Sequence, residues 1–330
     1  MNTVRQLLLR REAGILVMIV LFCAVVGLFR PRFLTLDELR IVLLLVPLIM
    51  IGAMGQMLVI VARHVDLSIG STQAFAAMVT ALMFKFHPEV PWALGFVVAV
   101  GVGVGLGLLN GLLIILFRLP AIIVTLGTLS LYRGLTYIVS NAKQVDRQFV
   151  PSALKAMSQT SPIFGIPWII FMAFGIALLT YWFANHTRAG RQIFALGSNP
   201  AAAPLRGIRV NVITLMVFAI SGGLAGLTGI MYASRWGFVN PSNTGNGFEF
   251  IVIAAVVIGG VSINGGVGSV FGVVLGVLLL GCVSAALPLL GIPGTAQNAI
   301  YGAVILVALL IDRLVRQRGG RALTATGAAA

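Results

Sequence analysis

The chain has 330 residues, of which 59% are hydrophobic and only 9% are charged, whereas soluble domains carry about 25% charged residues. This composition excludes a soluble globular protein and favours one membrane domain over residues 1–330. The net charge of +14 fits the preference of Lys and Arg for the cytoplasmic side of a membrane. It does not indicate nucleic-acid binding, because no aromatic residues interleave with a basic cluster.

Ten apolar stretches approach the length of about 20 residues that crosses a bilayer. Their continuous apolar character predicts helices, since backbone groups in lipid must pair within the segment. The predicted spans cover residues 13–29, 41–62, 69–84, 92–117, 120–140, 165–185, 212–234, 249–262, 268–287 and 297–311. The expected fold is an all-α integral membrane protein, a polytopic bundle of about ten transmembrane helices.

The first span follows a basic start, as a signal peptide does, but no small-x-small cleavage site follows it. We therefore expect an uncleaved span. Placing the N-terminus in the cytoplasm and alternating the spans puts most of the basic residues on the cytoplasmic side. Both termini, including a tail over 312–330, and the stretch 188–209 are then expected in the cytoplasm.

Two predicted spans, 69–84 and 249–262, are short, and each adjoins a polar or glycine-rich junction. One junction reads RHVDLSIG over 63–70, and the other reads GGVSINGGVGS over 259–269. Short, glycine-interrupted segments indicate broken helices near a substrate path. The alternative is a pair of ordinary turns between helices.

Glycines four residues apart recur in the spans 92–117 and 268–287, and Gly222 and Gly226 add another pair. Small residues at this spacing let helix backbones approach closely in lipid. A phosphate-binding loop is excluded, because no strand precedes the glycines and no Lys with Ser or Thr follows them.

The stretch 188–209 carries four arginines and no acid between two apolar spans. Asn199 is a good N-cap and Pro200 suits the first helical position, while Gly207 favours a helix end. We expect a short helix from Pro200 to Arg206 that docks in a groove of a cytoplasmic partner. The alternative is a solvated loop.

No lysine follows a glycine in this chain, which excludes a Walker motif and hence an ATPase. No Ser, Cys or His stands with partners as a nucleophile, and the histidines show no metal-ligand spacing. Cys23 and Cys282 are interpreted as small apolar residues, and not as a disulfide or metal site. The chain is therefore expected to be a transport subunit without catalytic residues, metal or cofactor of its own.

Polar side chains within the spans are the candidates for a substrate pathway. An arginine such as Arg133 costs roughly 2.5–3.5 kcal/mol in a span, so it should face the interior, with Glu249 or Asp66 as partner, or else snorkel outward. Asn110 could bond across helices or contact substrate. Asp66 with Ser68 could cap the following helix or line the pathway. The full candidate set is Asp66, Ser68, Asn110, Thr125, Thr128, Arg133, Glu249 and Asn264.

Four motifs resemble the permease subunits of bacterial sugar ABC importers, of the ribose, xylose, rhamnose and autoinducer-2 type. They are VDLSIG at 65–70, LPAIIVTLGTLSLYRG at 119–134, GRQIFALGSNPAAAPLRGI at 190–208 and IAAVVIGGVSINGGVGSVFG at 253–272. They follow the family's order and spacing, and the resemblance covers nearly the whole chain. It is specific for the family and not for one sugar.

The resemblance implies a multi-pass protein of the bacterial inner membrane. Its expected partners are a cytoplasmic ABC ATPase that binds ATP and Mg, a periplasmic sugar-binding protein docked on 141–164 and 235–248, membrane lipid, and a second permease as homodimer or heterodimer. No nucleic acid is expected. The third motif resembles the loop that couples to the ATPase, which assigns that role to Arg191, Gly197, Asn199, Pro200, Ala201, Ala202, Leu205 and Gly207.

Two positions depart from the family pattern. Pro200 stands where the family usually has an acid, which puts a charged contact to the ATPase in doubt. His64 begins a His-Val-Asp sequence where the family commonly has Gly-Ile-Asp.

The expected function is import of a monosaccharide, a pentose or deoxyhexose such as ribose, xylose or rhamnose, driven by the partner ATPase. The first alternative is import of autoinducer-2. The second is an ion-coupled secondary transporter, which usually needs acids within the membrane. Only Asp66 and Glu249 could serve, and both lie at span ends.

Overall fold

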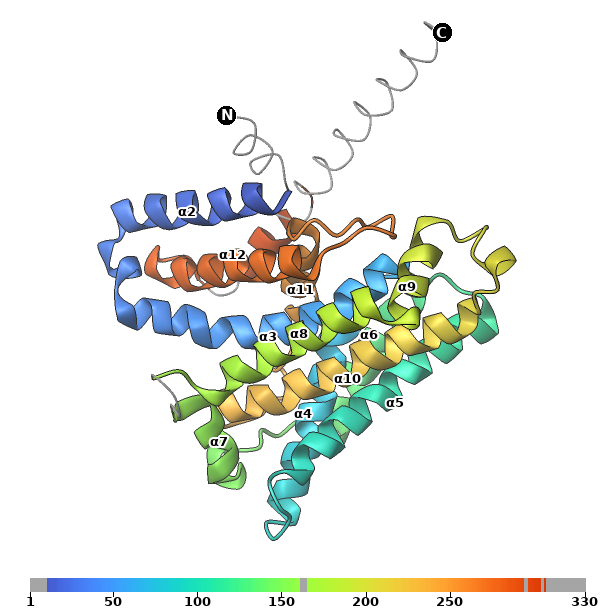
Figure 1. Cartoon of the computed structure of the whole chain (residues 1–330). Coiled ribbons are helices and arrows are strands. Elements are labelled where there is room, and N and C mark those ends of the chain that lie inside the picture. Colours follow the sequence, from blue (N-terminus) through green and yellow to red (C-terminus); the bar gives the residue numbers. More distant parts are fainter. Residues whose placement is uncertain (1–10, 161–164, 294–295, 304–305, 307–330) are drawn as a thin grey trace, which may run out of the picture.

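A computed structural model of the chain describes residues 11–160, 165–293, 296–303 and 306, and it is built of helices (Figure 1). Within this part, eight helices are long and apolar enough to cross a membrane. They are α2 (Arg11–Phe29), α3 (Leu36–Val61), α4 (Ile69–Phe86), α5 (Leu94–Phe117), α6 (Ala121–Ser140), α8 (Trp168–His186), α10 (Val210–Trp236) and α12 (Val270–Leu289). The shorter elements are η1 (Pro31–Leu34), η2 (Arg147–Phe149), α7 (Ser152–Gln159), α9 (Arg188–Ser198), η3 (Pro204–Arg206) and α11 (Phe248–Ile258).

Nine of the ten predicted spans are helices in the structure, and the predicted fold class is confirmed. The span predicted at 249–262 is the short helix α11, with 11 residues. The span predicted at 69–84 is longer than expected, because α4 has 18 residues. Of the tenth span, 297–311, residues 297–303 are helical, and most of the remainder lies outside the described residues.

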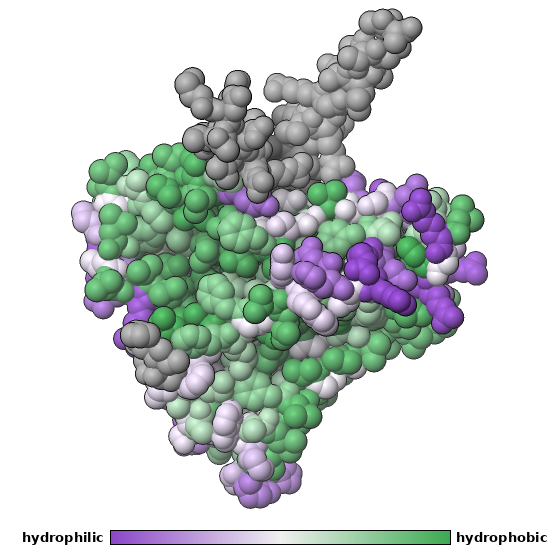
Figure 2. Space-filling model, in the orientation of Figure 1, coloured by the Kyte–Doolittle hydropathy of each residue, from purple (hydrophilic) through white to green (hydrophobic). Residues whose placement is uncertain are grey.

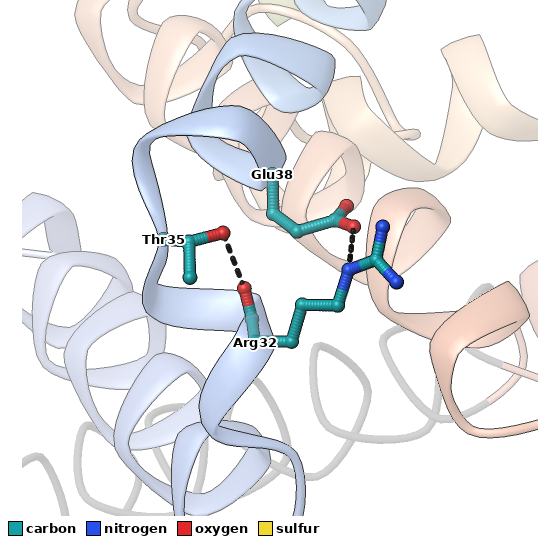
Figure 3. A network of polar contacts seen from close by, with 3 residues as sticks. All are labelled: Arg32, Thr35 and Glu38. Atoms are coloured by element: carbon teal, nitrogen blue, oxygen red, sulfur yellow. Dashed lines mark hydrogen bonds and ion pairs between the residues drawn. The ribbon is translucent and has the colours of Figure 1, made fainter.

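Helix α3 is the centre of the bundle and α2 its periphery. In an 18-residue window of each helix, 94% of the residues of α3 are buried, compared with 17% of the residues of α2. Helix α3 begins before the predicted span at 41, because a tight turn at η1 precedes it (Figure 3). There the Thr35 hydroxyl donates to the Arg32 carbonyl at 2.7 Å, and Arg32 Nε lies 3.4 Å from the buried Glu38 carboxylate. Glu38 also lies in the first helical turn, where a negative charge is stabilised.

The glycine repeat of α5 packs on α10, as its spacing predicted, but on one face only. A Cβ at Gly103 or Gly107 would collide with the backbone of Gly222 or Phe218. Gly101 and Gly105, on the other face, have nothing within 4 Å of such an atom. The alternate glycines thus allow backbone contact between α5 and α10, which is the most extensive helix pairing in the described chain.

Helices α2 and α12 lie side by side (Figure 1) and bring the two cysteines together. The sulfurs of Cys23 and Cys282 are 4.0 Å apart, and both are free thiols. The sequence interpretation excluded a disulfide but did not anticipate this proximity, since 259 residues separate the two positions.

The two segments expected to form the outer face meet at one end of the bundle. Val145 and Val239 form an antiparallel bridge, the isolated β-pairing in the described chain. The Ser158 and Ser234 hydroxyls are 2.7 Å apart and join α7 to α10. The stretch 188–209 lies at the opposite end of α8 and α10, where hydrophilic residues gather over α9 (Figure 2).

Candidate functional site

A buried carboxylate occupies the junction between α3 and α4. Asp66 is 1% exposed. Its Oδ1 accepts from the Ser68 amide at 2.9 Å and the Ser68 hydroxyl at 2.7 Å, and its Oδ2 accepts from the Ser221 hydroxyl of α10 at 3.2 Å. The Gln56 amide, in the orientation that satisfies both groups, bonds the Asp66 backbone at 3.2 and 3.3 Å. Asp66 therefore holds the start of α4 to both α3 and α10.

Hydrogen bonds extend this junction into α5 and α6. The Asn110 amide donates to the Ser68 hydroxyl at 2.8 Å and accepts from the Tyr132 hydroxyl at 2.9 Å. Thr125 donates to the Val65 carbonyl at 3.1 Å. A buried side-chain network of this kind positions its members rigidly when all are satisfied.

Four of the predicted pathway residues, Asp66, Ser68, Asn110 and Thr125, thus meet in one cluster. Thr128 lies close by and is buried, but its hydroxyl bonds the Thr125 carbonyl of its own helix. The contacts of Asn110 match the cross-helix role. Asp66 accepts from the amide of Ser68, which precedes α4, but no side chain caps an amide of the helix itself. Contact of either residue with substrate stays a prediction.

Arg133 reaches inward from α6 to the loop that precedes α11. Its Nη1 donates to the Thr244 carbonyl at 2.6 Å and the Pro241 carbonyl at 3.3 Å. Neither Glu249 nor Asp66 forms an ion pair with it in the described structure. Backbone carbonyls are recognised hydrogen-bond partners for a cation within a membrane protein. Here these bonds link α6 to the loop that precedes α11.

The first residues of α4 and α11 meet directly. A Cβ at Gly70 would collide with the Glu249 carboxylate and the Gly245 carbonyl. Glu249 is buried, at 7% exposure. The two interrupted segments singled out in the sequence are therefore neighbours, although about 180 residues separate them in the chain.

Asn264 lies apart from these residues. It is exposed in the junction 259–269, and its carbonyl accepts a hydrogen bond from Arg63 Nε. It belongs to a second site, where the end of α3, the end of α9 and the junction 259–269 converge.

At this second site, the α9 junction, three backbones touch. The Gly266 amide donates to the Val61 carbonyl at 2.9 Å. A Cβ at Gly197 would collide with both Val61 and Gly266. Gly266 and Gly265 have positive φ angles of 73° and 78°, which glycine adopts without strain. The end of α9 is thereby packed onto both helix interruptions.

The helix expected from Pro200 to Arg206 is wrong in position and type. The α-helix of this stretch is α9, which ends at Ser198, and turns lead to the short 3-10 helix η3. Pro204 has no amide hydrogen to continue an α-helix, so the turn closes by i to i+3 bonds, including Gly207 to the Pro204 carbonyl at 2.9 Å.

Two features of that prediction are confirmed. The Asn199 side chain accepts from the Ala202 amide at 3.0 Å, as a cap does. Gly207 ends η3 with a φ of 76°.

Helix α9 forms because one face is apolar and can be buried. Ile193 and Leu196 are buried, and the Thr187 hydroxyl caps the helix by accepting from the Gly190 amide at 3.0 Å. The residues predicted to couple to an ATPase then divide by exposure: Gly197 is buried, Ala202 is half-buried, and Arg191, Asn199, Pro200, Ala201, Leu205 and Gly207 are exposed. Leu205 is 88% exposed.

His64, the departure from the family pattern, joins α10 to the first junction. Its Nε2 lies 3.3 Å from the Thr214 hydroxyl, and its ring centroid lies 5.7 Å from that of Phe218. A glycine could make neither contact.

Sequence reasoning missed four buried residues in or beside the hydrogen-bond network around Asp66, namely Gln56, Gln73, Tyr132 and Ser221. Amides and hydroxyls within apolar spans were the available signal, because such groups must find partners inside the bundle. Among the described residues, no group of three His, Cys, Asp or Glu could hold a metal ion.

Residues 39–309 match the family described as "Branched-chain amino acid transport system / permease component". The chain is 35% identical over 307 residues to the "Autoinducer 2 import system permease protein LsrC" of Salmonella typhi, a match that spans 93% of this chain and 86% of that protein. The protein of the same name from Enterobacter sp. (strain 638) is 34% identical over 313 residues, spanning 95% and 90%. No solved structure matches the chain.

Proposed function

Since this chain belongs to the permease family of the branched-chain amino acid transport system type, we propose that it is the membrane subunit of an ABC importer for autoinducer-2. The relatives named for autoinducer-2 import align along nearly the whole chain. This support favours autoinducer-2 over ribose, xylose or rhamnose, the cargo expected first from the sequence. A monosaccharide is the second candidate.

The α9 junction is the observation that carries the proposal. Import against a gradient needs an energy input, and we assign it to an ATPase subunit that docks on the exposed residues of 188–209. Gly197 contacts the end of α3 and the junction 259–269 at once. A force on α9 would therefore reach both helix interruptions by rigid backbone contact.

The cargo path in this proposal runs beside the buried polar side chains around Asp66 and Arg133. A periplasmic binding protein would dock on the end formed by 141–160 and 235–248, and a second permease, identical or a sister chain, would complete the path. We propose that the chain spans the inner membrane of a bacterium, with both termini and α9 on the cytoplasmic side. Asp66 already accepts three hydrogen bonds from the protein, so ion-coupled transport is not favoured.

The coupling role is tested by Leu205→Glu, with Leu205→Met as the matched control. Leu205 is exposed, so the charge should leave insertion intact while it disrupts an apolar contact with the ATPase. Loss of about 1.4 kcal/mol of docking energy corresponds to tenfold weaker binding. We expect uptake and substrate-stimulated ATP hydrolysis to fall about tenfold. Full uptake by Leu205→Glu at normal expression would contradict the proposal.

The cargo is tested by uptake into cells or vesicles that contain the complete transporter. Labelled autoinducer-2, ribose, xylose and rhamnose are compared at equal concentration. Preferential uptake of autoinducer-2 supports the first candidate, and preferential uptake of one sugar replaces it with the second.

A further inference from the structure

A pocket of about 240 Å³ lies within the single chain, between α3, α4, α10, α11, α12 and the helix over 296–303. It is separate from the hydrogen bonds around Asp66. Its lining combines aliphatic, aromatic and amide side chains. At about 30 Å³ per water molecule, its volume corresponds to about eight waters, the scale of a small organic molecule.

A buried acceptor without a partner belongs to a residue in the wall of the pocket. Gln73 of α4 is 1% exposed and lines the pocket. Its Oε1 makes no hydrogen bond in the described structure. Buried polar atoms are nearly always paired, so each exception needs an explanation. A turn of the Gln73 amide toward the pocket would let a ligand hydroxyl supply the missing bond.

Further amide side chains line the pocket. Asn243 and Asn246 come from the loop before α11, and Asn298 and Gln297 come from the last described helix. Each amide offers both donors and acceptors, which suits a ligand whose hydroxyls do both. Asn243, Asn246 and Asn298 are exposed, so the pocket is reached from the surface on this side.

Apolar and aromatic residues also line the pocket. Tyr232 and Trp236 stack with ring centroids 4.4 Å apart and planes 19° apart, and both line the pocket. Leu48 and Ile251 contribute aliphatic surface. A pocket with apolar walls and a few placed polar groups is typical of small-molecule sites. An acyl chain could fill the apolar side, but it could not satisfy Gln73.

We propose that this pocket, formed by Gln73, Trp236 and Asn246, is a binding site for a small polyhydroxylated molecule. It deepens the function proposed above and depends on it for the identity of the cargo. The site lies inside one chain, so each permease of a pair would carry its own. Its ligand would place hydroxyls on the amides and carbon–hydrogen surface against the aromatic wall.

The test uses Trp236 as the reporter in the purified full-length chain. Trp92, Trp168 and Trp182 are replaced by Phe, which leaves Trp236 as the single tryptophan. The protein in nanodiscs is titrated with autoinducer-2 and, separately, with D-ribose. We expect a saturable change in Trp236 fluorescence with at least one probe. Gln73→Leu should weaken binding about tenfold, and Gln148→Leu, the same change at an exposed site, should not.

A second variant guards against misfolding of Gln73→Leu. Asn246→Ala alters an exposed residue at the pocket and should weaken binding about threefold. If transport of autoinducer-2 or ribose persists but neither probe changes Trp236 fluorescence, the pocket proposal is overturned and the transport proposal stands. Saturable binding without any transport would support the pocket and contradict the transport proposal. Quenching of Trp236 by brominated lipid, with no response to either probe, would assign the pocket to an acyl chain.

Discussion

The two helix interruptions, 62–68 and 259–269, are held in place by different means. The first is fixed by side chains: Asp66 and Ser68 bond to one another, to Ser221 and to Asn110. The second is fixed by backbone packing, since Gly266 bonds the Val61 carbonyl and lies against α9. The first interruption should tolerate conservative substitutions of its polar side chains. The second should not tolerate a Cβ atom at its closely packed glycines. The end of α9 contacts both interruptions, at Val61 and at Gly266.

The largest effect is expected from Gly266→Val. Its φ is 73°, and a Cβ would lie 2.6 Å from Ser198 Cα. Left-handed strain costs roughly 1–2 kcal/mol and overpacking roughly 1–3 kcal/mol, so we expect a loss of about 2–5 kcal/mol. Thermal unfolding in detergent measures it. Gly127→Val, in helical backbone with nothing within 4 Å, is the control. It should change stability by less than about 1 kcal/mol, because Val has a higher helix propensity than Gly. If the two variants are equally stable, backbone packing at Gly266 does not hold the second junction in place.

Asp66→Leu should have the next largest effect. It leaves the Ser68 and Ser221 hydroxyls without their acceptor, and each buried unpaired group costs about 1–3 kcal/mol. We expect a loss of about 2–4 kcal/mol. Asp66→Asn keeps an acceptor and should recover at least half of it in the same unfolding assay. If Asp66→Asn is as damaging as Asp66→Leu, the charge and not the bonding holds the first junction.

Tyr132→Phe probes the edge of the same network. Tyr132 is fully buried, and its hydroxyl contacts the Asn110 side chain at 2.9 Å and the Leu106 carbonyl at 3.0 Å. The change removes one donor and keeps the ring, so about 1 kcal/mol should be lost. Comparison with a Tyr132→Phe, Asn110→Ala double variant in a thermodynamic cycle measures the coupling. Additive losses would mean that the two side chains act independently.

The smallest effect is expected from Ser269→Ala at the second junction. The Ser269 hydroxyl caps α12 by accepting from the Gly272 amide at 3.3 Å. An N-cap contributes about 0.5–2 kcal/mol, and this long bond belongs at the low end. Unfolding of Ser269→Ala and Ser269→Thr is compared, since Thr keeps the hydroxyl. A loss that rivals Asp66→Leu would show that side chains hold both junctions.

Local patterns in the sequence predicted much of the architecture. Hydropathy located nine helices to within a few residues, because insertion of a helix in lipid depends on its own composition. The cap at Asn199 and the stop at Gly207 were found for the same reason, as both act within one turn of chain. The helix at α9 was missed, because its signal is a buried apolar face and not a long apolar run.

Only the tertiary structure decided which polar residues meet. Asp66 and Ser221 are 155 residues apart, as Cys23 and Cys282 are 259 apart, and composition does not encode which helix faces which. The same holds for Gln73, whose missing partner and neighbouring Trp236 appear only once α4, α10 and α11 are assembled. The sequence alone determined that the chain spans a membrane and resembles a permease. The packing of the helices decided that α9 contacts the two interruptions. Such backbone contact requires glycines from segments far apart in the chain to lie next to one another, which the sequence does not specify.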